Sequence, residues 1–172
     1  MQKEKQFTPL DKKPSLSPTG LKQIRFLIFV FVVLLIISGV TAFPIKWEFD
    51  LAYSYLKDAD RNSLIGQWFF NVYDAVTDTY NKYPFMAYGT DWLAFAHVVI
   101  GIAFIGPYRD PVKNIWVIQF GMIASIMVFP LAFIAGPIRG IPFFWQLIYC
   151  SFGVFGFLLL YYIYKKIKKL EA

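Results

Sequence analysis

His97 is the only histidine in this chain of 172 residues, and it stands within an apolar stretch. Ionisable side chains inside a membrane are costly and are often functional, so His97 could handle a proton or bind a ligand. It could equally be a neutral imidazole that bonds across helices to a backbone carbonyl, or to Gln119, Gln146 or Ser151. The sequence leaves both interpretations open.

Three further polar residues are candidates for a ligand site with His97. Asp91 lies six positions before His97, near the outer end of the same stretch, although this spacing puts the two on different helix faces. Arg139 stands in a Gly- and Pro-rich turn and could lie over the mouth of a helix bundle, or could extend to a lipid phosphate instead. Gln146 lies near the start of the last apolar stretch. We predict a ligand site formed by His97, Asp91, Arg139 and Gln146.

The chain carries no motif for catalysis, metal or cofactor binding. A single histidine excludes a haem held by two histidines of this chain, and a single cysteine, Cys150, excludes an intrachain disulfide. No phosphate loop, zinc motif or nucleotide fingerprint is present. We therefore predict no catalytic residue, no metal and no cofactor, and the sequence favours a protein that is not an enzyme.

Four apolar segments must position the candidate residues. Apolar residues make up 58% and aromatic residues 20% of the chain, which is more than a soluble domain of this size can bury. The segments cover about residues 26–43, 91–108, 114–136 and 142–164, and a helix of about 18 residues just crosses a hydrocarbon core. The sequence predicts an all-α, polytopic membrane protein with four transmembrane helices.

The first apolar segment has a rival interpretation as a cleaved signal peptide, because small residues near Ala42 resemble a cleavage site. The long polar region before it and Pro44 just after it favour an uncleaved anchor.

Residues 44–90 form an outer segment with two patterns. Apolar residues recur at helical spacing over about 63–81, which predicts an amphipathic helix capped by Asn62 or Ser63. Its aromatic side chains suit the membrane interface, and it could also pack across the mouth of the bundle. Residues 45–55 alternate with period two, but a lone strand has no partner. We expect an extended or irregular segment there, or a short helix built on Leu51, Tyr55 and Leu56.

Local signals also mark the last two spans. Asp110 followed by Pro111 is typical of a helix start, and Pro130 should kink the third span. Small residues such as Gly121 and Gly153 should let helices approach closely.

The basic residues divide unequally between the two sides of this bundle. One side holds both termini and the 108–114 hairpin, with twelve of the 17 basic residues: Lys3, Lys5, Lys12, Lys13, Lys22, Arg25, Arg109, Lys113, Lys165, Lys166, Lys168 and Lys169. The other side holds five. This bias predicts cytoplasmic termini, with residues 1–24 as a flexible tail and residues 25–172 as a single membrane domain. Short loops and the charge bias favour a bacterial inner membrane. The net charge of +6 is explained by lipid headgroups and does not indicate nucleic acid.

Two functions agree with these features. The first is a structural or accessory membrane protein that packs with itself or with a larger membrane partner, because intramembrane polarity is sparse and aromatic surface is abundant. The alternative is a transporter or small-ligand-binding membrane protein with an outward-facing cavity around His97.

Overall fold

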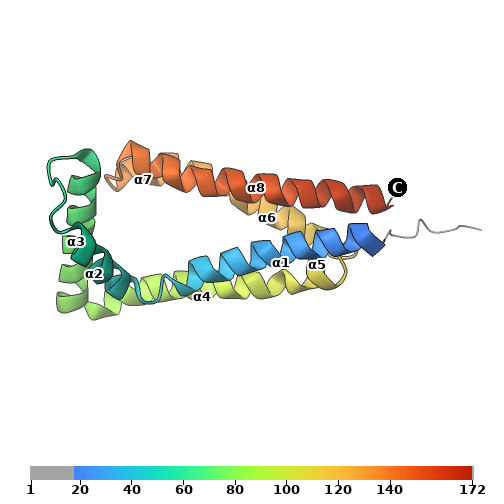
Figure 1. The fold of residues 1–172 in the computed structure, drawn as a ribbon, viewed down its shortest axis with the longest axis horizontal. Coiled ribbons are helices and arrows are strands. Elements are labelled where there is room, and N and C mark those ends of the chain that lie inside the picture. The colour runs from blue at the N-terminus through green and yellow to red at the C-terminus, as the bar shows by residue number, and fades with distance from the viewer. Residues whose placement is uncertain (1–17, 172) are drawn as a thin grey trace, which may run out of the picture.

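Residues 18–171 are described by a computed structural model, which is helical along most of its length (Figure 1). The part of the expected tail before residue 18 lies outside the described residues. Within them no strand occurs, and four helical segments are long and apolar enough to span a membrane: Thr19–Val40, Pro84–Arg109, Ile115–Ile138 and Phe143–Leu170. The predicted all-α, four-span class is confirmed.

The first span is α1 (Pro18–Val40), which begins inside the segment expected to be a tail. The early start has a packing reason, because Ile24 and Ile28 are fully buried in the hydrophobic core. The helix also ends before the predicted boundary at residue 43, and a turn over residues 41–44 follows it.

The second span is built from a 3₁₀ turn, η1 (Pro84–Ala87), followed by α4 (Tyr88–Ala103) and the short helix α5 (Ile105–Arg109). Because α4 begins at Tyr88, Asp91 lies in its first turn. The helix therefore starts earlier than predicted.

The third and fourth spans are α6 (Ile115–Pro130), the π-helical turn η2 (Leu131–Ala135), the short α7 (Gly136–Ile138), and α8 (Phe143–Glu171). The predicted helix start at Asp110–Pro111 is wrong by a few residues. The Asp110 carboxylate accepts from the backbone N–H of Lys113 at 3.0 Å, which closes a turn, and α6 begins only at Ile115. Pro130 ends α6 and is followed directly by the π-helical turn, since proline supplies no N–H for the regular ladder; the kink expected at Pro130 stays a prediction.

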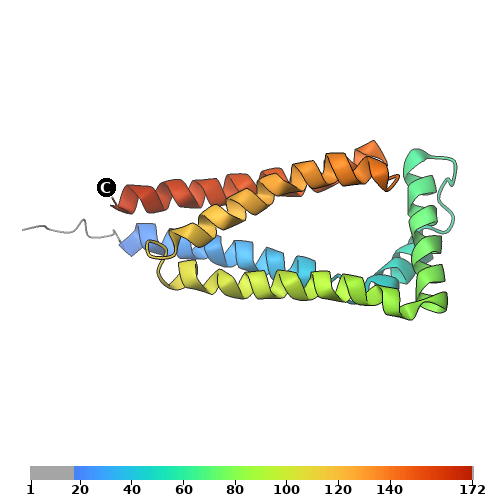
Figure 2. The same cartoon turned by 180° about the vertical axis from the view of Figure 1, so that it is seen from behind.

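The four spans form two packed pairs, α1 with α4 and α6 with α8. Both views show the pairs close together at the end that holds the C-terminus and the start of α1, and apart at the other end (Figures 1 and 2). We call the first of these ends the closed end and the second the open end. The core joins the pairs at the closed end and consists of Ile24, Ile28, Phe104, Ile118, Leu160, Ile163 and Ile167.

Small residues bring the helices of the second pair together, as predicted. A Cβ on Gly121 would lie 2.6 Å from Leu160 Cδ1 and 2.8 Å from Phe104 Cζ. A Cβ on Gly153 would lie 2.7 Å from the carbonyl oxygen of Ser125. At Gly153 the neighbour is backbone, so a side chain there would push α6 and α8 apart, whereas at Gly121 the ends of the Leu160 and Phe104 side chains would have to shift.

The outer segment contains two helices, α2 (Ile45–Leu56) and α3 (Leu64–Lys82). A short helix over residues 45–56 is therefore confirmed, but the residues on which it was expected to be built are wrong. Leu51, Tyr55 and Leu56 are exposed, and α2 packs on α3 through Phe49 and Tyr53. The predicted amphipathic helix is also confirmed, and the Ser63 hydroxyl caps it by accepting from the backbone N–H of Gly66 at 3.1 Å. In both views α3 lies crosswise to the spans at the open end (Figures 1 and 2).

Aromatic contacts hold this outer layer in place. Tyr53 of α2 stacks on Tyr73 of α3, with ring centroids 4.3 Å apart. Trp68 of α3 meets Trp145 at the start of α8, with ring centroids 6.4 Å apart. The other end of α3 runs into η1 and α4, so α3 connects the two helix pairs across the open end of the molecule.

Candidate functional site

His97 lies where α1 and α4 come close together. A Cβ on Gly39 of α1 would lie 2.6 Å from His97 Cβ and 2.9 Å from the carbonyl oxygen of Ala94. The half-buried imidazole has its Nδ1 at 2.8 Å from the carbonyl oxygen of Leu93, one turn earlier in the same helix. A carbonyl only accepts, so Nδ1 is the donor in this bond.

The side chains considered as partners of His97 bond elsewhere or are exposed. The buried Gln146 donates from Nε2 to the carbonyl oxygen of Ile141 at 2.8 Å. Ser151 donates to the carbonyl oxygen of Ile148 at 2.6 Å. Gln119 is exposed on α6. The interpretation of His97 as an imidazole bonded to a backbone carbonyl fits the structure, but the carbonyl belongs to its own helix.

Gln146 stabilises the hairpin between η2 and α8. Its side chain packs against the helix at Gly136, where an added Cβ would lie 3.0 Å from the Gln146 side chain. Its bond to Ile141 fixes the chain reversal. Arg139 is exposed in this hairpin, next to Gly140, whose φ of 68° is the left-handed conformation that glycine permits.

The four predicted site residues lie on two different helix pairs. Asp91 and His97 belong to α4, whereas Arg139 follows α7 and Gln146 belongs to α8. Both views show these pairs apart at the end where α3 lies (Figures 1 and 2). Among the ion pairs of the described residues, none joins Asp91 to Arg139. The predicted ligand site stays a prediction.

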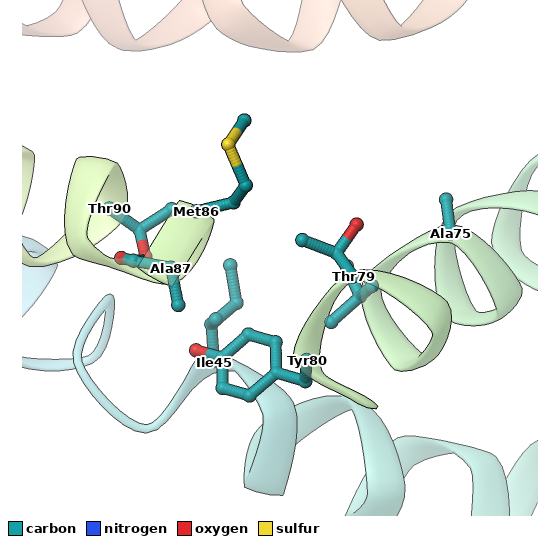
Figure 3. Close-up of a pocket in the computed structure, with 8 residues that line it drawn as sticks. Ile45, Ala75, Thr79, Tyr80, Met86, Ala87 and Thr90 are labelled. Carbon is teal, nitrogen blue, oxygen red and sulfur yellow. Dashed lines mark hydrogen bonds between the residues drawn. The ribbon is translucent and has the colours of Figure 1, made fainter. Parts of the chain in front are cut away.

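A shallow pocket of about 200 Å³ lies at the start of α4, near α2 and α3 (Figure 3). Its lining comes from α2, α3, η1 and α4, and includes Ile45, Val76, Thr79, Tyr80, Met86 and Thr90. The Thr90 hydroxyl donates its hydrogen to the carbonyl oxygen of Ala87 at 2.6 Å, so it has no hydrogen left to donate to a ligand. The pocket can take an apolar group, and none of the four predicted residues lines it.

The outer layer holds one compact polar network. Asp50 of α2 pairs with Lys46 of the same helix and accepts from the Tyr73 hydroxyl of α3 at 3.2 Å. The hydrogen bond from Lys46 is the main cause that lowers the pKa of Asp50. The network fastens α2 to α3. Over residues 18–171, no group of three or more potential ligands could hold a metal ion.

The closed end also contains a surface depression that the sequence analysis did not predict. A depression of about 360 Å³ lies between α1 and α5, and its lining residues are Lys22, Arg25, Phe26, Phe29 and Tyr108. Arg25 donates from Nε to the carbonyl oxygen of Tyr108 at 3.1 Å and from Nη2 to that of Arg109 at 2.9 Å. The spacing of Lys22, Phe26 and Phe29 at positions i, i+4 and i+7 could have revealed this surface.

The geometry as a whole is that of an α-helical, multi-pass membrane protein with two helix pairs and a crosswise outer helix. Comparison with known protein families, with curated proteins and with solved structures finds no match for this chain.

Proposed function

We propose that this protein is a structural or accessory component of a membrane assembly, and that its spans pack against further transmembrane helices. These helices belong to a second copy or to a larger partner. The observation that carries the proposal is the open arrangement of the two helix pairs. They share a core near the termini and separate toward α3, so the membrane-facing sides of four helices are available for contact.

The surface of α6 supports this role. Gln119 is exposed one turn into the helix, and the described residues provide no hydrogen-bond partner for its amide. A polar side chain on a membrane-facing surface is a common means of helix association, because a neighbouring helix can satisfy it. The large apolar side chains that flank it, Trp116 and Ile123, are also exposed.

Native mass spectrometry of the protein released gently from its membrane tests the proposal. A multiple of the 19.9 kDa chain, or the chain together with a second polypeptide, supports it. A bare monomer under all mild conditions contradicts it. A monomer that retains a small molecule, and loses it in the His97→Ala variant with the fold intact, would instead support the ligand-binding alternative.

The role of α6 is tested by Gln119→Leu. A helix-to-helix hydrogen bond in a membrane contributes about 1 kcal/mol, so the variant should weaken association about fivefold. Asn71→Leu is the matched control, because Asn71 is an exposed amide on α3 and outside the spans. Equal effects of the two substitutions would show that α6 is not part of the interface.

We further propose that the membrane is the bacterial inner membrane and that both termini are cytoplasmic. The support is the excess of basic residues at the closed end. A fluorescent protein that folds only in the cytoplasm, fused after Ala172, should be bright. A dark fusion, together with an active periplasmic phosphatase fused at the same place, would reverse the orientation.

A further inference from the structure

We propose that the depression between α1 and α5, lined by Lys22, Arg25 and Tyr108, binds the phosphate headgroup of an anionic phospholipid. The acyl chains of this lipid lie along Phe26 and Phe29. The inference does not depend on the proposed assembly role, since it concerns a lipid site on the single chain.

The guanidinium of Arg25 is held in a fixed place. It is half-buried, and its two hydrogen bonds to the carbonyl oxygens of Tyr108 and Arg109 tie α1 to the end of α5. These bonds use Nε and one Nη2 hydrogen, so Nη1 and the second Nη2 hydrogen can still donate to a ligand. A cation that is already ordered loses little conformational freedom when an anion binds.

The order of side chains along α1 matches the shape of a lipid. Lys22, Phe26 and Phe29 follow one another on the same side of the helix, over about 10 Å at 1.5 Å per residue. The cation stands at the helix end, and the two rings continue toward the hydrocarbon core. Both rings are more than half exposed, at 63% and 54%, so they are free to contact acyl chains.

The local charge favours an anion. The stretch from Thr19 to Arg25 contains no acid, and Asp110 is the one acid in residues 105–114. Its carboxylate accepts from the backbone N–H of Lys113, and this bond is the main cause that lowers its pKa. A second oxygen of Asp110 lies 3.6 Å from Lys113 Nζ. The only acid of the hairpin is therefore compensated by another cation, and Lys22 and Arg25 remain available to a phosphate.

Lipid titration of the full chain in neutral detergent, followed by native mass spectrometry, tests the site. The probes are phosphatidylglycerol and phosphatidylcholine with the same acyl chains. We expect one phosphatidylglycerol to bind at least about fivefold more tightly than phosphatidylcholine, since one basic side chain near a lipid surface contributes about that factor. Lys22→Gln should remove most of this preference.

Lys169→Gln is the matched control, because it removes the same charge from the same end of the molecule at the exposed end of α8. It should leave the preference unchanged. Equal losses in the two variants would show attraction to a diffuse basic surface and overturn the site. Equal binding of the two lipids would also overturn it.

Inorganic phosphate in large excess distinguishes a lipid from a free anion. The Phe26 and Phe29 contacts predict that inorganic phosphate fails to displace the lipid, and that Phe29→Ala weakens lipid binding. Displacement by inorganic phosphate, with no effect of Phe29→Ala, would assign the depression to free phosphate and contradict the proposal. The exposed position of Phe29 makes this variant a mild one for folding.

Discussion

At Gly39 the first two spans approach each other so closely that a single methyl group has no room. The Cβ of an alanine there would lie 2.6 Å from His97 Cβ and 2.9 Å from the carbonyl oxygen of Ala94. Neither atom is the end of a flexible side chain, so α1 and α4 must move apart. We predict that Gly39→Ala lowers the free energy of unfolding by about 1–3 kcal/mol. Denaturation of the purified protein in mixed micelles, followed by circular dichroism, measures this change.

Gly89 provides the control for that substitution. It lies in the first turn of α4, and an added Cβ would have no heavy atom within 4 Å. Gly89→Ala should therefore leave stability unchanged or raise it by up to about 1 kcal/mol, because alanine favours a helix. If both variants behave alike, the close approach of α1 to α4 at Gly39 is not a source of stability.

At the scale of elements, the attachment of α2 to α3 should depend on pH through Asp50. Its folded-state pKa is lowered, chiefly by the hydrogen bond from Lys46, so its contribution is present above the ordinary pKa of about 4 and is lost as pH falls through the folded value. We predict that the near-ultraviolet circular dichroism of the stacked Tyr53 and Tyr73 weakens on acidification below about pH 4. Asp50→Asn should show the weakened signal already at neutral pH. Asp74→Asn, an exposed acid on α3, should behave like the wild type.

The contact between Trp68 and Trp145 joins α3 to the second helix pair. Two aromatic rings in contact contribute about 0.5–1.5 kcal/mol beyond the area that they bury. A double-mutant cycle with Trp68→Ala and Trp145→Ala should therefore give a coupling energy in that range. The same cycle with Trp68 and Trp116, which is exposed near the start of α6, should be additive. Additivity in both cycles would mean that this aromatic contact does not hold the open end.

The same elements show what a sequence can predict. The four spans were found because about 20 consecutive apolar residues have few other uses, and α3 was found because its polar and apolar sides differ. The alternation over residues 45–55 was misleading on its face. Trp47, Leu51 and Tyr55 of α2 are all exposed, so this helix carries apolar residues on more than its packed side. Their spacing at i, i+4 and i+8 is helical, but the same residues also fit a period of two over this short stretch, so the pattern alone does not distinguish a helix from a strand.

At the scale of the whole molecule, the relation between the helix pairs could not be predicted. The spans are apolar on all sides, and hydropathy does not say which side meets a neighbour. For the same reason, the grouping of Asp91, His97, Arg139 and Gln146 relied only on their expected position near one mouth of the bundle. In the structure they lie on separate helix pairs, and the Gln146 side chain bonds to the carbonyl oxygen of Ile141 in the preceding turn. The contacts of Arg25 could not be predicted from the sequence either, because its partners are backbone carbonyls 83 and 84 residues away.

The distribution of contacts predicts that the two pairs move most at the open end. The core lies at the closed end, while the Trp68–Trp145 contact holds α3 to α8 at the other. Spin labels test this in a Cys150→Ala background, at Val40 and Leu147 for the open end and at Ile105 and Leu158 for the closed end. All four side chains are exposed. Pulsed electron paramagnetic resonance in lipid nanodiscs should give a broad distance distribution for the first pair of labels and a narrow one for the second. Trp145→Ala should broaden only the first. Equally narrow distributions in the wild type and the variant would mean that the open arrangement is rigid, and that a partner helix must fit between pairs whose separation is already fixed.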